Sequence, residues 1–321
     1  MAQDNFVILE GRGVLAVSGV DRRSFLQGLV SNDVEKLAPD RALYAALLTA
    51  QGKYLHDFIM VDEGDAIWFD AEAARLPDLR RRLSIYRLRA KVALDERPDL
   101  AVAAVFGEGV PAVLGLAGEP GTARQLEGGI VLADPRLAEL GARAILPREA
   151  LRPALVALGL AETDFAVWDR HRLALGIPDG SRDLVVDKSI LLEAGFDELH
   201  GVDWQKGCYI GQELTARTKY RGLIKKRLFP VRIEGKAPAP GTIVTSDGRD
   251  AGEFRSSHDG LGLALLRLDA VAEGRPLSAE AATLVPLHPD WMRIDGEDAP
   301  HPNPFPAGGE REGPAPSGVG G

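Results

Sequence analysis

The chain has 321 residues, of which 45% are hydrophobic and 26% charged, a composition typical of a globular protein. Its formal net charge of −9 disfavours a general nucleic-acid-binding role, because proteins that coat DNA or RNA are basic. A single cysteine excludes an internal disulfide and a metal site built from this chain's thiols alone. The length predicts two or three domains, since one core seldom grows beyond about 250 residues.

The N-terminus, MAQDNFVILEGRG, lacks a basic start and a long apolar run, and it carries two acids within ten residues. These features disfavour a signal or transit peptide. No stretch approaches the roughly 20 uninterrupted apolar residues of a membrane span, so we expect no membrane partner. Together with the lone cysteine, they predict a cytoplasmic location.

The first half of the chain is predicted to alternate between strands and helices, from apolar spacings of two and of three to four. Hairpin connections such as the acidic turn at 62–65 favour an α+β fold over a dinucleotide-binding sheet. No glycine-rich phosphate loop follows a strand. Strands are predicted at 6–17 (two short ones), 43–50, 55–61, 66–69, 92–94, 100–105, 130–133 and 144–146. Helices are predicted from Asp21 to Leu29, at 71–86 with a kink or delayed start at Pro77, at 110–116, 148–158 and 164–175.

After Arg221 the pattern changes to short strands separated by Gly, Asp and Ser turns, at 227–233, 242–245, 251–256 and 261–266. This predicts a small β-barrel or sandwich. The final stretch, 296–321, is rich in Pro, Gly and Glu and is predicted to be disordered. The predicted division is 1–95 and 96–190 as two α+β subdomains, 191–222 as a cysteine-containing segment, 223–290 as the barrel and 291–321 as the tail.

The only cysteine lies in Lys-Gly-Cys-Tyr-Ile-Gly-Gln-Glu, residues 206–213. Gly207 and Gly211 permit backbone angles and close approaches that a side chain would forbid. Lys206 and Arg217 are cations near the thiol, and a nearby cation favours the thiolate that attacks electrophiles and binds metals. The segment therefore predicts a sulfur displayed in a positive, tightly turned pocket. The alternative is a small buried hydrophobe, the commoner role of a lone cysteine.

Six cations fall within the eleven residues 217–227 of this acidic chain: Arg217, Lys219, Arg221, Lys225, Lys226 and Arg227. A solvated face is one explanation. The other is a site for an anionic ligand, such as the glutamate tail of a folate, or for an acidic partner. The cluster lies between two predicted domains, where ligand sites are common.

Extended to residue 217, the cysteine segment resembles the hallmark of the YgfZ-type folate-binding proteins, within the superfamily of the glycine cleavage T-protein (GcvT, aminomethyltransferase). Similar blocks occur at 19–34, 51–57 and 176–178. Residues 178–184 and 226–231 are similar to the mitochondrial iron–sulfur assembly members in particular. The resemblance extends over about residues 5–270.

The resemblance implies an α+β ring of three subdomains around a central opening, with a small C-terminal β-barrel. It implies tetrahydrofolate binding in that opening and a role in assembling or repairing iron–sulfur clusters, chiefly of the four-iron kind. Cys208 matches the position that, in the mitochondrial branch, is thought to help ligate a [2Fe-2S] cluster shared with an A-type carrier protein. Client iron–sulfur enzymes are the other implied partners.

The sequence departs from the T-protein pattern where that family has acidic residues. Its Asp-Asp pair is here His56-Asp57. The glutamate that holds the pterin has two imperfect counterparts: residues 192–195 match by letter but lie close to Cys208, whereas residues 172–176 have the better spacing and place Ala174 at that position. Alanine offers no acceptor, which disfavours aminomethyl transfer. We expect His56 to be a plain surface residue, the alternative being a proton carrier or metal ligand.

The leading hypothesis is a folate-binding maturation factor for iron–sulfur clusters that presents Cys208 at a basic opening. The alternatives are a tetrahydrofolate-dependent aminomethyl or methyl transferase, for which Asp57 is the available carboxylate, and a non-catalytic partner-binding module. Predicted catalytic residues are Cys208, Lys206 and Asp57, and Cys208 is the predicted metal ligand. Predicted cofactor contacts are Gly207, Tyr209, Gly211, Gln212, Glu213, Arg217 and Arg172, with Gln212 and Glu213 anchoring the turn or orienting Arg217.

Overall fold

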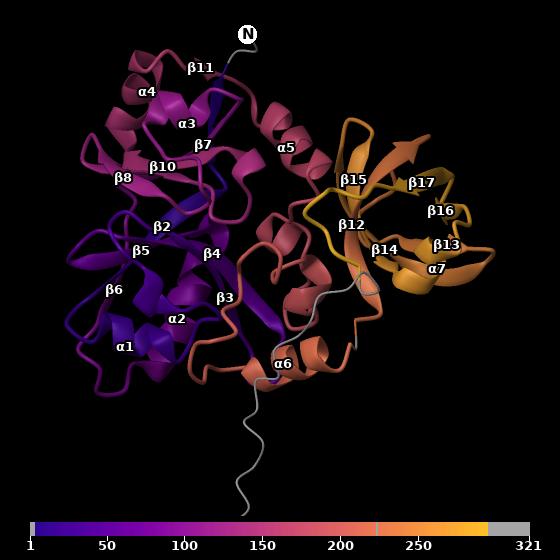
Figure 1. The fold of residues 1–321 in the computed structure, drawn as a ribbon, viewed down its shortest axis with the longest axis horizontal. Coiled ribbons are helices and arrows are strands. Elements are labelled where there is room, and N and C mark those ends of the chain that lie inside the picture. The colour runs from indigo at the N-terminus through magenta and orange to yellow at the C-terminus, as the bar shows by residue number, and fades with distance from the viewer. Residues whose placement is uncertain (1–3, 223, 295–321) are drawn as a thin grey trace, which may run out of the picture.

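Two β-sheets and a β-barrel, joined by a long irregular segment, make up the molecule (Figure 1). The structure is a computed structural model that describes residues 4–222 and 224–294. Most of the predicted tail, residues 295–321, therefore lies outside the described residues. The mixed helix and strand content and the closed barrel confirm the predicted α+β class.

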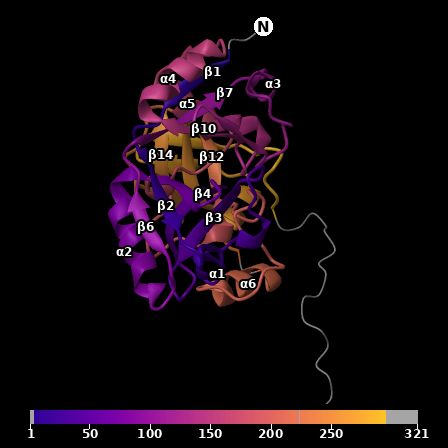
Figure 2. The same cartoon turned by 90° about the vertical axis from the view of Figure 1, so that its left-hand side faces the viewer.

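The first sheet is antiparallel, with strand order β3-β4-β5-β2-β6. Helices α1 (Arg22–Gln27) and α2 (Leu76–Arg87) cover one of its faces, where Leu26, Leu79 and Leu83 are buried (Figure 2). Pro77 lies in the first turn of α2, so it sets a delayed start rather than a kink. The strands are β2 (Arg12–Ser18), β3 (Leu43–Leu48), β4 (Tyr54–Asp62), β5 (Ala66–Glu72) and β6 (Ala93–Glu96), and short 3-10 turns cover Val34–Lys36 and Ala73–Arg75.

Helix α1 is shorter than predicted, because it ends at Gln27 while Leu29 is buried beyond it. Asp21 occupies the N-cap position, but its side chain makes no capping hydrogen bond to the helix. Its carboxylate accepts instead from the backbone N–H of Lys91, at 2.7 Å. A long-range hydrogen bond therefore takes the place of the predicted local cap.

The second sheet has the order β11-β1-β7-β10-β9-β8. Strand β1 (Asn5–Ile8) pairs with β7 (Leu100–Phe106), so Phe6 lies opposite Val105. The first strand of the chain thus belongs to the second sheet, unlike the predicted 1–95 unit, because pairing across a hundred residues leaves no local signal. The other elements are β8 (Ala123–Leu126), β9 (Gly129–Ala133), β10 (Ala142–Pro147), β11 (Ala161–Glu162), α3 (Val110–Leu114), α4 (Arg148–Ala157), α5 (Phe165–Ala174) and a 3-10 turn at Ala138–Leu140.

The two sheets share one core, to which Trp68 of the first sheet and Val102 and Ile145 of the second contribute. Phe196 and Tyr209, from the irregular segment, are buried in the same core. Residues 177–211 thus fold against the sheets, with 3-10 turns at Gly180–Arg182 and Leu191–Ala194. The position of the cysteine motif is therefore decided by core packing.

A closed barrel with order β12-β15-β14-β13-β16-β17 forms the third body. It encloses its own core, including Phe229, Val244, Phe254 and Leu266, and closure leaves no free sheet edge. This confirms the predicted small β-barrel. Its elements are β12 (Lys226–Glu234), β13 (Ile243–Ser246), β14 (Arg249–His258), β15 (Leu261–Arg267), α7 (Leu268–Ala272), β16 (Leu277–Ala279) and β17 (Ala282–Pro286).

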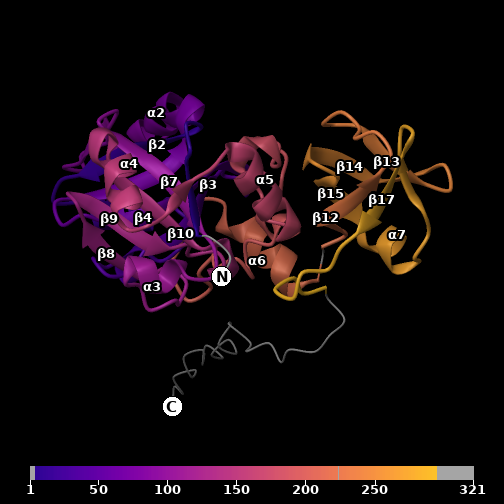
Figure 3. The ribbon, with the colours of Figure 1, turned by 90° about the horizontal axis from the view of Figure 1, so that it is seen from above.

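Helices α5 and α6 (Gln212–Tyr220) lie between the two-sheet body and the barrel (Figure 3). Arg227 of β12, buried at 4% exposure, donates to Glu198 at 2.8 Å and to the carbonyl of Leu192 at 3.2 Å. The barrel is thereby tied to the segment that carries the cysteine. In the described part of the chain, no helix has both the length and the apolar character needed to cross a membrane.

Candidate functional site

Cys208 is exposed, on a loop whose flanking side chains are buried. Lys206 and Tyr209 are each 7% exposed, and they hold the loop from both sides. The thiol therefore projects to solvent from a fixed base. The alternative of a buried, hydrophobe-like cysteine is excluded.

Lys206 anchors the loop. Its ammonium donates to the backbone carbonyls of Val30 and Asn32, at 2.6 and 2.7 Å, and lies 5.0 Å from the centre of the Tyr209 ring. Burial lowers the pKa of Lys206 to about 8. The predicted role was to stabilise a thiolate at Cys208; the structure instead shows the ammonium bonded to the turn after α1.

Gly211 and Gly52 bring the cysteine motif and the β3–β4 hairpin into backbone contact. Gly211 has φ +83°, and a Cβ there would lie 2.6 Å from the carbonyl oxygen of Thr49. Gly52 has φ +74°, and its Cβ would lie 2.7 Å from the carbonyl oxygen of Gly211. Only glycine fits both positions without displacement. Gly207 differs, since a Cβ there meets nothing within 4 Å.

Gln212 and Glu213 play different parts at the start of α6. The side-chain carbonyl of Gln212 accepts from the N–H of Tyr209 at 3.3 Å, which is the predicted anchoring of the turn. Glu213 pairs with Arg217 at 4.0 Å, with 90% and 52% of their side chains exposed. Such surface pairs contribute little stability, so these two side chains remain available to a partner.

The cation cluster at 217–227 does not form one basic surface. Lys219 bonds to Asp197 at 2.8 Å and lies 4.1 Å from the centre of the Trp204 ring, while Arg227 is buried against Glu198. Arg221 and Lys225 are exposed and form no ion pair with any described residue. The free positive charge close to α6 is therefore smaller than the sequence predicts.

Asp57 is buried between two tyrosines. Its Oδ1 accepts from the Tyr54 hydroxyl at 2.7 Å and its Oδ2 from the Tyr44 hydroxyl at 3.0 Å. Burial, together with the charge of Asp57, raises the pKa of both tyrosines well above the usual range. Both carboxylate oxygens therefore already have donors, which weakens the case for Asp57 as a catalytic group.

His56 is 3% exposed, so the expectation of a surface residue is wrong. Neighbouring strand residues point to opposite faces, and His56 reaches Asp78 of α2, with Nε2 3.0 Å from Oδ2. Burial, aided by the charge of Arg75, lowers the pKa of His56 to about 4. The imidazole is therefore neutral near pH 7 and serves packing between β4 and α2.

The titration of His56 should make the fold sensitive to acid. In the unfolded chain the histidine has a pKa near 6.5, whereas in the folded protein the pKa of His56 is about 4. Between these two values only the unfolded state binds the proton, so stability is lost as pH falls through this window. The loss has an upper limit of about 3 kcal/mol. Urea unfolding of His56→Gln at pH 7 and pH 4.5 should show a smaller pH effect than wild type, whereas His200→Asn, at an exposed position, should not. An unchanged effect in His56→Gln would assign the sensitivity to other groups.

A cleft of about 570 Å³ lies where the two sheets and the cysteine segment meet. Tyr44 forms part of its wall, which places Asp57 directly behind that wall. Its cations are Lys36, paired with Asp203, and Arg41, whose side chain forms no ion pair with any described residue. Its volume suits a small-molecule ligand. Lining residues are Asn32, Lys36, Arg41, Ala42, Leu43, Tyr44, Glu119, Pro120, Pro135, Asp197, His200, Val202, Asp203 and Trp204.

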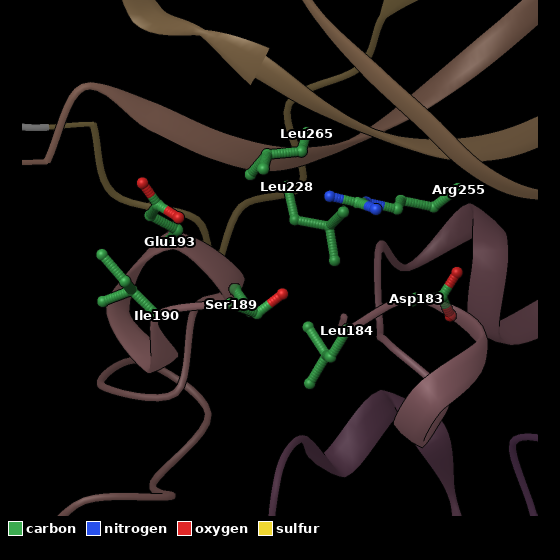
Figure 4. A pocket seen from close by; sticks show the side chains of 9 residues that line it. Asp183, Leu184, Ser189, Ile190, Glu193, Leu228, Arg255 and Leu265 are labelled. Carbon is green, nitrogen blue, oxygen red and sulfur yellow. The ribbon is translucent and has the colours of Figure 1, made fainter. Parts of the chain in front are cut away.

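Glu193, whose flanking sequence matches the pterin-binding pattern, lines a second cavity of about 10 Å³ (Figure 4). Glu193 and Arg255 lie on opposite sides of it, and burial raises the pKa of Glu193. The space is large enough for about one water molecule. Glu193 therefore does not face a space that admits a pterin ring.

Arg172 bridges α5 and the barrel. Its guanidinium donates to Asp169 at 2.6 Å, to Asp183 at 2.7 Å and to the Ser256 hydroxyl at 3.3 Å, and it is 2% exposed. These bonds occupy the donors that were predicted to contact a cofactor. None of the seven predicted contact residues, all of which the structure describes, is among those lining the 570 Å³ cleft. Three residues of the site were not predicted from the sequence, because their roles arise from contacts between distant segments: Arg41, Tyr44 and Gly52.

Two sheets, an irregular segment and a closed barrel together make up a fold of the T-protein type. The fold is similar to that of aminomethyltransferase T of the glycine cleavage system from Bartonella henselae, with a TM-score of 0.74 over 89% of this chain and 85% of that one. The sequence identity is 16%, so this likeness concerns the fold alone. Residues 225–294 match the family model of the CAF17 C-terminal beta-barrel domain.

The chain belongs to the family of the iron–sulfur cluster assembly factor IBA57. It is 36% identical to the mouse (Mus musculus) protein over 307 residues, covering 88% of this chain and 84% of that one. It is 35% identical to the human protein with the same coverage, and 31% identical to the homologue of Mycosarcoma maydis over 81% of this chain and 73% of that one. The family resemblance of the cysteine motif is thereby confirmed.

The prediction of a cytoplasmic location is wrong when judged by these relatives, all three of which are named as mitochondrial proteins. The prediction rested on thirteen N-terminal residues and on the scarcity of cysteine. Neither observation concerns the folded structure or the site.

Proposed function

We propose that this protein acts in iron–sulfur cluster assembly by presenting Cys208 as a ligand to a cluster that it shares with a carrier protein. The observation that carries the proposal is an exposed thiol on a loop held by the buried side chains of Lys206 and Tyr209 and by the contact between Gly52 and Gly211. A cysteine that merely filled space would not need to be exposed.

The need for a partner follows from the number of ligands. A cluster commonly takes four protein ligands, and this chain has one thiol. Among the described residues, no group of three or more His, Cys, Asp and Glu side chains is arranged to hold a metal ion. The remaining ligands would come from the partner, and a thiol-rich carrier of the A-type is the partner that this chemistry fits.

The proposal is tested by mixing the purified protein with an A-type carrier, iron and sulfide under anaerobic conditions. We expect visible absorption from a cluster in a species that contains both proteins and separates from either one by size-exclusion chromatography. A cluster that forms on the carrier alone, with the same spectrum and no complex, would contradict the proposal.

We further propose that tetrahydrofolate binds in the 570 Å³ cleft, with Arg41 receiving a carboxylate of the glutamate tail. The volume supports this placement, as does the guanidinium of Arg41, which is free of any ion pair with a described residue, whereas the other cation, Lys36, pairs with Asp203. Glu119 also lines the cleft without an ion pair to a described residue, so the carboxylate of the ligand is placed at Arg41 and away from Glu119. The cations at 217–227 are not among the lining residues. The site differs from the predicted one, which centred on the cysteine segment.

Tetrahydrofolate should raise the melting temperature of the wild-type protein, because a ligand that binds only the folded state stabilises it. Arg41→Glu should weaken binding by about tenfold or more, since it replaces an attraction by a repulsion. Calorimetry measures both affinities. Arg221→Glu is the matched control, an exposed arginine outside the cleft, and should bind like wild type. Absence of a thermal shift in the wild type would leave the partner-binding module as the better description.

A further inference from the structure

The C-terminal end of α2 and the turn after it, residues 84–91, form an exposed surface that the proposed function does not use. We call these residues the α2 tip. They contain Ile85, Tyr86 and Leu88, three cations and no acid. Ile85 is 60% exposed, Tyr86 42% and Leu88 90%. Large apolar side chains gathered among cations on a surface are typical of an interaction site.

Leu88 stands out because its backbone favours glycine. It has φ 41° and ψ −105°, and the N–H of Ala90 donates to the carbonyl of Arg87 at 2.7 Å. This is the first central position of a type II′ turn, which glycine normally occupies. A leucine there is strained, and its exposed side chain gains no packing in return. The combination indicates that the side chain serves something outside this chain.

A second apolar residue projects beside the tip. Val20 is 78% exposed, on the turn in which Asp21 accepts from the N–H of Lys91 at 2.7 Å. Gly19, with φ +104°, lies against the same segment, since a Cβ there would be 2.1 Å from the carbonyl oxygen of Lys91. Val20 and the tip are therefore held together by the Asp21 carboxylate and by the close backbone packing at Gly19.

The charge around Leu88 is positive and unpaired. Within the described part of the chain, the side chains of Arg87, Arg89 and Lys91 form no ion pair. The acid in direct contact with the tip is Asp21, whose carboxylate accepts from the N–H of Lys91, so three cations face one carboxylate. The acidic loop at 62–65 adjoins the Val20 turn, where the carbonyl of Gly64 accepts from the Arg22 guanidinium. At physiological ionic strength charges act over about 8 Å, so the tip presents a local positive field despite the net charge of −9.

We propose that the α2 tip docks the protein on an anionic lipid surface. Leu88 and Val20 project from the surface, and a bilayer accepts projecting apolar side chains without a matching pocket. Arg87, Arg89 and Lys91 would meet the lipid headgroups, each contributing about fivefold to the partition coefficient. A tyrosine at the level of the headgroups fits the same arrangement. The sequence predicted no membrane partner because it lacks a span, but surface docking needs none.

Docking at the tip would leave the cysteine site free. Helices α2 and α6 lie on different sides of the two-sheet body in the views of Figures 2 and 3. Cys208 lies four residues before α6. The protein can therefore bind a lipid surface through one side and present the Cys208 thiol to a carrier protein on another.

The test is co-sedimentation of the full chain with phosphatidylcholine vesicles, with or without phosphatidylglycerol. We expect binding to the anionic vesicles only, and weaker binding at high salt. Leu88→Gly should reduce partitioning by about tenfold, because the apolar anchor is lost, while raising the melting temperature by about 2 °C, because the strain is relieved. The double variant Arg87→Glu/Arg89→Glu should reduce partitioning by more than tenfold.

Matched controls exist elsewhere in the chain. Ile243→Thr changes an apolar residue of the barrel that is 60% exposed, as Ile85 is at the tip. Arg221→Glu/Lys225→Glu reverses two unpaired cations away from the tip. Both should bind anionic vesicles almost as wild type does. The proposal is overturned if wild type ignores anionic vesicles, binds neutral ones equally, or is matched by the tip variants. Tip-dependent binding to polyglutamate without vesicle binding would replace the lipid with an acidic protein partner.

Discussion

Cys208→Ser should leave the fold intact and abolish formation of a shared cluster with the carrier protein. The side chain is exposed, so its replacement should change the free energy of unfolding by no more than about 0.5 kcal/mol. The thiolate is the soft ligand that iron–sulfur clusters require, and a serine hydroxyl remains protonated and hard. We therefore expect the visible absorption of the shared species to disappear while urea unfolding is unchanged.

The same variant should fail in cells that depend on this protein. The activity of cluster-containing enzymes should fall to the level measured without the protein. Gly207→Ala is the matched control, because a Cβ there would have no heavy atom within 4 Å beyond its two chain neighbours. It should support these enzymes normally. Full support by Cys208→Ser would remove the thiol from the mechanism and leave the partner-binding role.

Gly211→Ala should have the largest effect on stability, a loss of about 2–4 kcal/mol. The backbone at φ +83° is unfavourable for alanine and costs about 1 kcal/mol. The added Cβ would also lie 2.6 Å from the carbonyl oxygen of Thr49 and 2.8 Å from the Cβ of Leu48, an overpacking that costs a further 1–3 kcal/mol or so. Equilibrium urea unfolding measures the loss.

The two contributions can be separated with Gly241→Ala. Gly241 has a similar φ of +86°, but a Cβ there meets nothing within 4 Å, so this variant should lose only the backbone contribution. Equal losses in the two variants would show that the close packing of the motif against the hairpin adds nothing to the free energy lost in Gly211→Ala. If the contact positions Cys208, Gly211→Ala should also reduce shared-cluster formation at temperatures where it remains folded.

Local structure was largely predictable. Helix α4 begins at the predicted Arg148, and the hairpin of β4 and β5 forms around the predicted acidic turn, with Phe58 opposite Ala71. These elements depend on spacing, turn residues and proline positions that lie within a few residues of each other. The barrel strands β12 to β15 were predictable for the same reason, because they follow one another, whereas β16 and β17, which complete the barrel, were not predicted.

The site was predictable in composition but not in detail. The motif around Cys208 identified the loop, yet the Lys206 ammonium bonds to the turn after α1, 176 and 174 residues earlier in the chain. Nothing in the sequence near His56 indicated its contact with Asp78, and nothing near Arg172 indicated its hydrogen bond to Ser256. Side chains with several donors find partners by proximity in the fold, and proximity between distant segments has no local pattern.

By itself the sequence determined most of the strands and helices, though not α6 or the last two barrel strands, β16 and β17. It also determined that the chain contains a single thiol, and the family motif in which that thiol lies. The tertiary structure decided that the thiol is exposed, that β1 joins the second sheet, and that Lys206 anchors the loop to the carbonyls of Val30 and Asn32. Secondary structure depends on neighbours along the chain, whereas exposure and hydrogen-bond partners depend on the packing of segments that only the folded core brings together.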